Sequence, residues 1–286
     1  MNKTHLLLIL FLIFSNCILI SQNNDWQPAY IPPHVSNSQL ERMVTKEFGN
    51  LKFTVDPTMS MSERNDVVRK TKEYIAQCLE LINEEPFDDS IHIYLVPTRN
   101  DMKNLIGGAI GGTSQTKSMF SSENSIYCVY GEKHSPLKHE IMHMVASLKW
   151  GDEIGVNLLW FSEGLATFFG SDAEDCDGHI IEERYVYFLQ NNILFENDVL
   201  VEFKIENEKI QRKIAYNQSA YIVQYLLENF GVLKLKCLWE SDMDNFEEIY
   251  GIKFNDLILE INERLNRKYP TPIHFNWKGF IFDCIE

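Results

Sequence analysis

Two stretches of the sequence decide the fold, Ser135–Lys149 (SPLKHEIMHMVASLK) and Asn157–Phe169 (NLLWFSEGLATFF). Ser135 followed by Pro136 is typical of a helix start, so we expect a helix over about residues 136–149. The second stretch is apolar nearly all round, which is typical of a buried helix, and we expect it over about residues 156–170. The two stretches therefore predict a pair of neighbouring helices at the centre of the molecule.

The first of these helices carries His139, Glu140 and His143 in the pattern HExxH. Residues i and i+4 lie on one face of a helix, so both imidazoles can bind one metal ion. Glu140 then lies beside them and can hold a water molecule. The alternative interpretation is two surface histidines on an ordinary amphipathic helix.

A catalytic metal site needs a third protein ligand. The pattern HExxHxxGxxH does not supply one, because Ala146 and Lys149 occupy its last two defined positions. Glu163, in the middle of the second helix, is the better candidate, since a buried carboxylate is costly unless it is paired or bound to a metal. The alternatives are a buried salt bridge or a helix kink at Gly164.

The motifs together resemble the gluzincin metallopeptidases, which have HExxH and a downstream Glu. Nineteen residues separate His143 from Glu163, and Trp160–Ala166 (WFSEGLA) is similar to the WLNEGFA segment of the aminopeptidase-N-type enzymes. The segment from Tyr216 to Gly231 is similar to their YxKG…YL…G helix, with Ser219 in place of the usual Gly. The sequence has no GxMEN motif, so the resemblance does not extend to aminopeptidase specificity.

The resemblance implies one Zn²⁺ per chain, held by His139, His143 and Glu163. It also implies that Glu140 activates a water molecule and that Tyr216 donates to the oxyanion of the tetrahedral intermediate. Tyr221 is the fallback for this last role, and simple core packing is the alternative for either tyrosine.

The remaining pattern indicates an α+β fold, in which a small strand-rich N-terminal part packs on a mainly helical, zincin-type C-terminal part with the active site between them. We expect an irregular segment at 22–45, strands at 50–55 and 91–96, and helices over 61–83 and from Thr98 to Gly107. After 156–170, further helices are expected at about 179–192, 216–229, 231–240, 244–249 and 254–267, with a hairpin at 193–212 and an aromatic C-terminal segment packed on the body. The predicted domains are 22–134 and 135–286.

Several residues are candidates for supporting roles. The predicted paired strands around Met119–Phe120 and Ser125–Tyr130 would offer an edge to an extended peptide, and the glycine loop 107–113 would flank the cleft. Asp172, Glu174 and Thr167 are candidates for orienting the metal-binding histidines. His134 is expected to be a loop residue.

Residues 1–21 have the pattern of a secretory signal: a short basic start, an apolar run from Leu6 to Ile20 and an abrupt polar boundary. We therefore expect a secreted or periplasmic protein. Lipidation at Cys17 and an uncleaved N-terminal anchor are the alternatives. Five cysteines follow this segment, an odd number, and allow one or two disulfides whose pairing the sequence does not define.

The charge excludes some partners. Twenty-six basic residues against forty-one acidic ones give a net charge of −15, which repels nucleic acid and anionic membrane surfaces. No second segment is apolar enough to span a membrane.

The function that the sequence predicts is an exported zinc metallopeptidase acting on a peptide or protein substrate. The alternatives are a catalytically inactive exported binding protein that keeps a structural zinc on a peptidase fold, and a zinc hydrolase that acts on a non-peptide bond.

Overall fold

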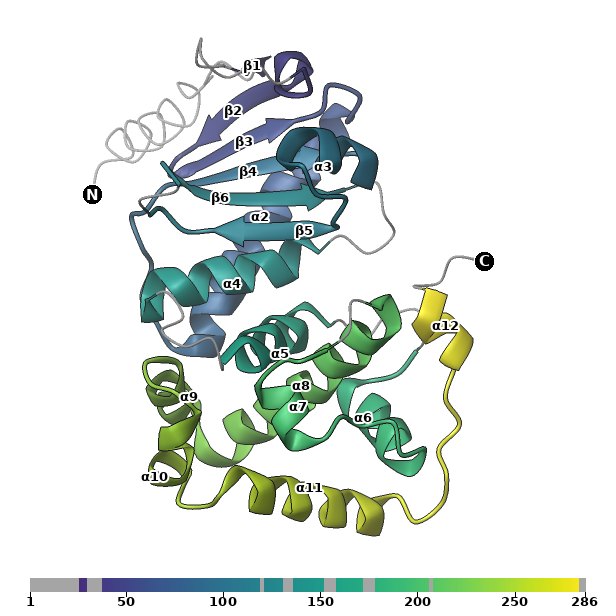
Figure 1. Ribbon diagram of the computed structural model, residues 1–286. Coiled ribbons are helices and arrows are strands. Elements are labelled where there is room, and N and C mark those ends of the chain that lie inside the picture. Colours follow the sequence, from purple (N-terminus) through teal and green to yellow (C-terminus); the bar gives the residue numbers. More distant parts are fainter. Residues whose placement is uncertain are drawn as a thin grey trace, which may run out of the picture.

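The computed structural model of the chain describes residues 26–29, 38–118, 121–130, 136–151, 158–171, 178–205 and 208–282 (Figure 1). The predicted signal segment lies outside these residues. The strands are β1 (Gln27–Pro28), β2 (Val44–Phe48), β3 (Leu51–Val55), β4 (Ile91–Val96), β5 (Gly112–Gln115) and β6 (Asn124–Val129). The helices that follow or separate them are α2 (Met61–Ile82), α3 (Arg99–Ile106), α4 (Leu137–Trp150), α5 (Leu159–Gly170), α6 (Ile181–Gln190), α7 (Asn197–Val201), α8 (Lys209–Phe230), α9 (Val232–Trp239), α10 (Phe246–Tyr250), α11 (Phe254–Lys268) and α12 (Trp277–Phe282).

The strands form one mixed sheet in the order β1-β2-β3-β4-β6-β5. The three central strands, β3, β4 and β6, run parallel, and the outer pairings are antiparallel. The C-terminal half is helical, so the α+β prediction is confirmed (Figure 1).

Local signals set several of these elements as predicted. Ser60 and Glu63 form a reciprocal capping box at the start of α2, and Asn83 ends the helix in the left-handed conformation. Thr98 caps α3, which ends at Gly107 with a positive φ of 83°. Residues 193–212 differ from the prediction: they hold α7 and the first turn of α8 instead of a hairpin, because Leu200 is buried there. The prediction of an irregular segment over 22–45 is also too broad, because β1 and the start of β2 lie within this range.

One buried cluster runs from the sheet through α2 and α4 to α5, α8 and α11, and holds side chains such as Phe53, Ile126, Ile141, Phe161 and Ile222. The opposite face of the sheet carries α3 over a smaller cluster of Met43, Val96, Met102 and Val129. The predicted domain boundary after residue 134 lies outside the described residues, and the domain limits stay a prediction.

The C-terminal segment packs back on the body, as expected. Phe280 of α12 is buried beside Phe188 and Ile214, and Lys213 Nζ donates to its backbone oxygen at 2.5 Å. Cys78 and Cys128 are buried thiols and Cys237 is an exposed one, so none of these three forms a disulfide. Cys176 and Cys284 lie outside the described residues. No described helix has the length and apolar character needed to cross a bilayer.

Helices α5 and α8 are in close contact at Gly164. A Cβ added there would lie 2.8 Å from the backbone oxygen of Ser219, which is tighter than real Cβ contacts. The helix continues through Gly164 to Gly170, so a kink is not what the glycine provides. Gly164 instead allows α8 to approach α5, the helix that carries Glu163. The small residue Ser219 of α8 faces Gly164.

Gly164→Ala is expected to lower the free energy of unfolding by about 1–2 kcal/mol, because the clash with Ser219 outweighs the roughly 1 kcal/mol gained in helix propensity. Urea denaturation measures the change. Gly108→Ala is the matched control, since a Cβ there meets nothing within 4 Å, and it should stay within about 0.5 kcal/mol. A stabilised Gly164→Ala would contradict the close approach.

Candidate metal centre

Helix α4 presents one face to the core and the other to a cleft. Ile141 and Val145 are fully buried, whereas the side chains of His139 and His143 are 20% and 16% exposed. Glu163 on α5 faces them with 17% of its side chain exposed. Gly170 at the end of α5 lies against His139, and Ser162 lies against His143, so the two helices run antiparallel.

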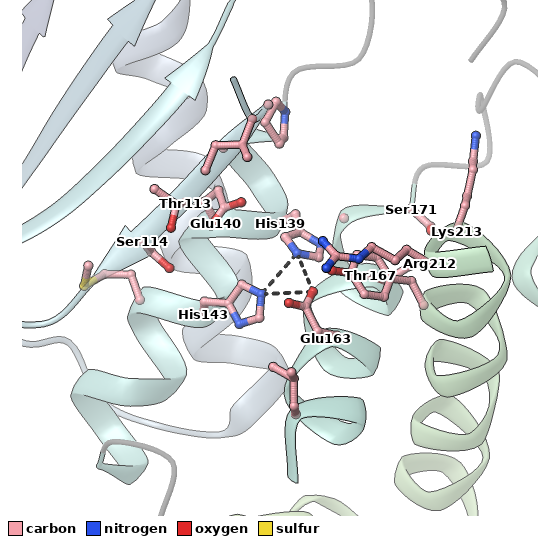
Figure 2. A pocket seen from close by; sticks show the side chains of 18 of the residues that line it. Thr113, Ser114, His139, Glu140, His143, Glu163, Thr167, Ser171, Arg212 and Lys213 are labelled. Atoms are coloured by element: carbon pink, nitrogen blue, oxygen red, sulfur yellow. Dashed lines mark hydrogen bonds and ion pairs between the residues drawn. The ribbon is translucent and has the colours of Figure 1, made fainter. Parts of the chain in front are cut away.

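Three ligand atoms converge between these helices. His139 Nε2 lies 3.1 Å from His143 Nε2 and 3.2 Å from Glu163 Oε2, and His143 Nε2 lies 3.6 Å from the same oxygen (Figure 2). Ligands at about 2.0–2.2 Å from one tetrahedral ion such as Zn²⁺ are separated from each other by about 3.3–3.6 Å. The triangle therefore fits a single metal ion. Among the described residues, this is the one His, Cys, Asp and Glu group of its kind.

Glu163 Oε2 is buried and close to both imidazoles. Neither contact has the geometry of a hydrogen bond. Burial acts to raise the pKa of Glu163, but the contacts with His139 and His143 and their charges overcome it and hold the pKa well below its usual value. An ionised carboxylate facing two imidazole nitrogens is the donor set of a His₂Glu metal site.

Ser162 orients one of the imidazoles. Its Oγ lies 3.0 Å from His143 Nδ1. A proton on Nδ1 donated to this hydroxyl leaves the lone pair of Nε2 directed into the triangle. Ser162 is not among the predicted residues, although it directly precedes Glu163, because helix periodicity alone does not identify contacts between helices. Of the predicted orienting residues, Thr167 lines the cleft, with an Oγ1 that has no hydrogen-bond partner among the described residues. Asp172 and Glu174 lie outside the described residues, as does His134.

Glu140 lies between the metal ligands and the sheet. It is 7% exposed, and burial is the main cause that raises its pKa to about 7, with the charge of Glu163 adding to the rise. The charge of His139 and a hydrogen bond with Ser114 act in the opposite direction. A Cβ added at Gly112 would lie 2.8 Å from Glu140 Oε1, so only a glycine lets β5 lie directly over this carboxyl group.

The edge strand beside the site is β5. The sequence predicts edge strands around 119–120 and 125–130, but β6 is an interior strand paired on both sides, and 119–120 lie outside the described residues. The edge comes instead from the end of the predicted glycine loop, whose Gly111 and Gly112 line the cleft as expected. Figure 2 shows Thr113 and Ser114 of β5 on the side of Glu140 and His143.

Tyr216 of α8 lies beside the metal-binding triangle. Its ring stacks at 6.4 Å from that of His139, with 27° between the planes, and it lines the cleft. Burial, followed by the charge of Glu163, raises the pKa of its phenol, so the group stays protonated and able to donate. Tyr221 lies elsewhere: its hydroxyl accepts from Arg264 Nη2 at 2.7 Å and contacts Glu182 at 3.2 Å.

These elements enclose a cleft of about 970 Å³ between β5 and helices α4, α5 and α8. The metal-binding triangle, Glu140 and Tyr216 all open into it. The cleft is large enough for several residues of an extended chain.

Ser162→Ala is expected to weaken metal binding by about 10- to 100-fold, because His143 loses the contact that fixes its ring. Competition between the protein and a chelator for Zn²⁺ measures the affinity. Ser147→Ala, in the same cleft on α4, is the matched control and should bind as the wild type does. Equal affinities for Ser162→Ala and the wild type would show that Ser162 has no orienting role.

No protein-family model matches the sequence, and no curated protein matches it. The chemistry assigned to this site therefore rests on its own residues: three converging ligand atoms, a buried carboxyl group beside them and a protonated phenol. The site as described is compatible with one bound metal ion.

Proposed function

We propose that the protein is an exported zinc metallopeptidase of the gluzincin type. The observation that carries the proposal is the placement of Glu140 between the His139–His143–Glu163 triangle and β5, the last strand of the described sheet. A His₂Glu donor set favours zinc, and a ligand set with one open position favours catalysis over a purely structural role. Export rests on the signal-like residues 1–21 of the sequence.

The chain supplies a means of aligning a peptide. The outer edge of β5 lines the cleft, and its backbone groups can pair with an extended substrate by strand addition. A peptide held there would pass over Glu140 and the metal ligands. When bound, Zn²⁺ supplies a Lewis acid that polarises a carbonyl group and lowers the pKa of water.

Glu140 is the group that moves the proton. Its carboxylate can accept a proton from a water molecule in the cleft and pass it to the amine nitrogen that leaves. The Tyr216 phenol, which stays protonated, can donate to the carbonyl oxygen as negative charge develops on it. Such a contact speeds the reaction to the extent that it strengthens in the transition state.

Glu140→Gln should retain zinc. Its rate of hydrolysis of a quenched-fluorescent peptide library should fall by about 10²–10⁴-fold, because the amide cannot accept the proton. Zinc content and turnover are measured on the same preparation. Removal of the metal with a chelator and its readdition to the wild type provide the control. Undiminished turnover in the variant would exclude Glu140 as the base. A zinc-loaded wild type that cleaves no peptide would favour the non-enzymatic binding protein or, if it cleaves esters, a non-peptide hydrolase.

Tyr216→Phe should lower kcat by about 10²-fold with little change in KM, because the lost donor acts mainly in the transition state. Steady-state kinetics on one good peptide substrate tests this. Tyr221→Phe is the matched control: its hydroxyl lies outside the cleft, so kcat should change less than about twofold. Equal effects of the two substitutions would assign Tyr216 to packing alone.

A further inference from the structure

The C-terminal segment crosses the helical half of the molecule and returns to the cleft. After α11 ends at Lys268, the chain runs past α6 to α12 (Figure 1). The amide nitrogen of Gln190, the last residue of α6, donates to the backbone oxygens of Tyr269 and Thr271 at 3.1 Å. Its amide oxygen accepts from Ile273 N at 3.0 Å. One side chain thus fixes three backbone groups of the segment that leads to α12.

Helix α12 is held by both α6 and α8. The ring of Phe280 is buried and lies 5.5 Å from the ring of Phe188 on α6. On α8, Lys213 Nζ donates to the backbone oxygen of Phe280 and lies 4.6 Å from its ring. Asn276 caps the helix, because its Oδ1 accepts from Gly279 N at 2.9 Å. The position of α12 is therefore defined by side-chain contacts on two sides.

Two residues of α12, Gly279 and Phe280, line the cleft. They lie at the end of the cleft beyond His139, where Gly170 at the end of α5 packs against that histidine. The start of α4, the start of α8 and Arg184 of α6 line the same end. Five of the described helices therefore meet there, and α12 is the last of them along the chain.

The other end of the cleft lies beyond His143. The described residues that line it come from α4, from the start of α5, and from β5 and its connection to β6. Leu159, the first residue of α5, is 39% exposed there although its side chain is large and apolar. Within the described ranges this end has no counterpart of α12, and Leu159 marks its opening to solvent.

The direction of β5 relates the two ends to a substrate. Gly112 lies against Pro136, at the end that α12 lines, and the strand runs from there toward Gln115. Antiparallel pairing is the more stable form of strand addition, and a peptide bound in that way runs in the opposite direction. Its residues that follow the scissile bond then point toward α12.

The room on that side of the metal centre is short. The ring of Tyr216 stacks on that of His139, and Lys209 is the lining residue of α8 that lies farthest before it. From residue 209 to residue 216 an α-helix rises by about 10 Å. Each residue of an extended peptide spans about 3.3 Å, so this length holds about three residues.

We propose that α12 is a specificity-determining element that limits a substrate to about three residues after the scissile bond. The inference rests on the proposed peptidase function and names its substrate class: peptides that are cut near a free C-terminus. Residues before the scissile bond leave through the end at Leu159, and their number is not limited.

Two fusions of one randomised peptide to a small folded carrier test this with the zinc-loaded wild type. In the first fusion the peptide follows the carrier and has a free C-terminus, and in the second it precedes the carrier. Mass spectrometry locates each cut and gives its rate. The first fusion should be cut within about three residues of its C-terminus. This cut should be at least about tenfold faster than any cut in the second fusion, because the carrier cannot pass α12.

A chain that ends at Asn276 lacks α12, and the difference between the two fusions should fall to less than about threefold. A chain that ends at Phe282 keeps α12 and is the matched control, which should behave as the wild type does. Circular dichroism and zinc content show which chains are folded. Asn276→Ala, which removes only the cap of α12, should reduce the difference in the same direction and serves if the shorter chain does not fold.

Cuts in the middle of the peptide, cuts near a free N-terminus, or a difference that is undiminished in every folded α12 variant would overturn the inference. Equal cleavage of the two fusions would also overturn it and would leave the peptidase standing. If the wild type cuts neither fusion, the peptidase proposal fails, and fluorescence anisotropy of the two labelled fusions then decides the role of α12. Binding that is about tenfold tighter for the free C-terminus would keep that role, whereas equal binding or none would overturn it.

Discussion

The buried carboxylate of Glu163 limits how the two central helices, α4 and α5, can pack. It sits on a helix that is apolar nearly all round, where an unpaired charge would be costly. His139 Nε2 and His143 Nε2 lie 3.2 and 3.6 Å from Glu163 Oε2, and a metal ion held by the three groups would compensate the charge. The antiparallel contact of α4 and α5 brings the three groups together. Glycines at the contacts permit this arrangement: Gly170 lies against His139, and Gly164 lies against α8. The same packing brings Tyr216 to the site.

The sheet and the helices contribute different parts of one site. The helices position the metal-binding triangle and the phenol, whereas the sheet provides an open edge, β5, that lies over Glu140 through Gly112. These groups therefore lie on elements that belong to one continuous core.

The parts of the site that were predictable are those with local signals. An i, i+4 pair of histidines and a carboxylate inside an apolar helix are visible in the sequence, and so is the capping box of α2. The edge strand was missed because Gly112–Gln115 lacks apolar alternation and is defined by its pairing with β6. Ser162 was missed because its role depends on a contact between helices. The start of α8 was missed because its charged first turns give no core-facing pattern, and tertiary packing determines them.

His139, His143 and Glu163 are together expected to hold one metal ion. The most direct measurement is the zinc content per chain of the purified protein after reconstitution and removal of free metal, with Glu163→Ala measured in parallel. We expect one zinc per chain in the wild type and a large loss of zinc in the variant, with both proteins folded by circular dichroism. A folded wild type that binds no zinc, or a variant that binds as much as the wild type, would contradict it.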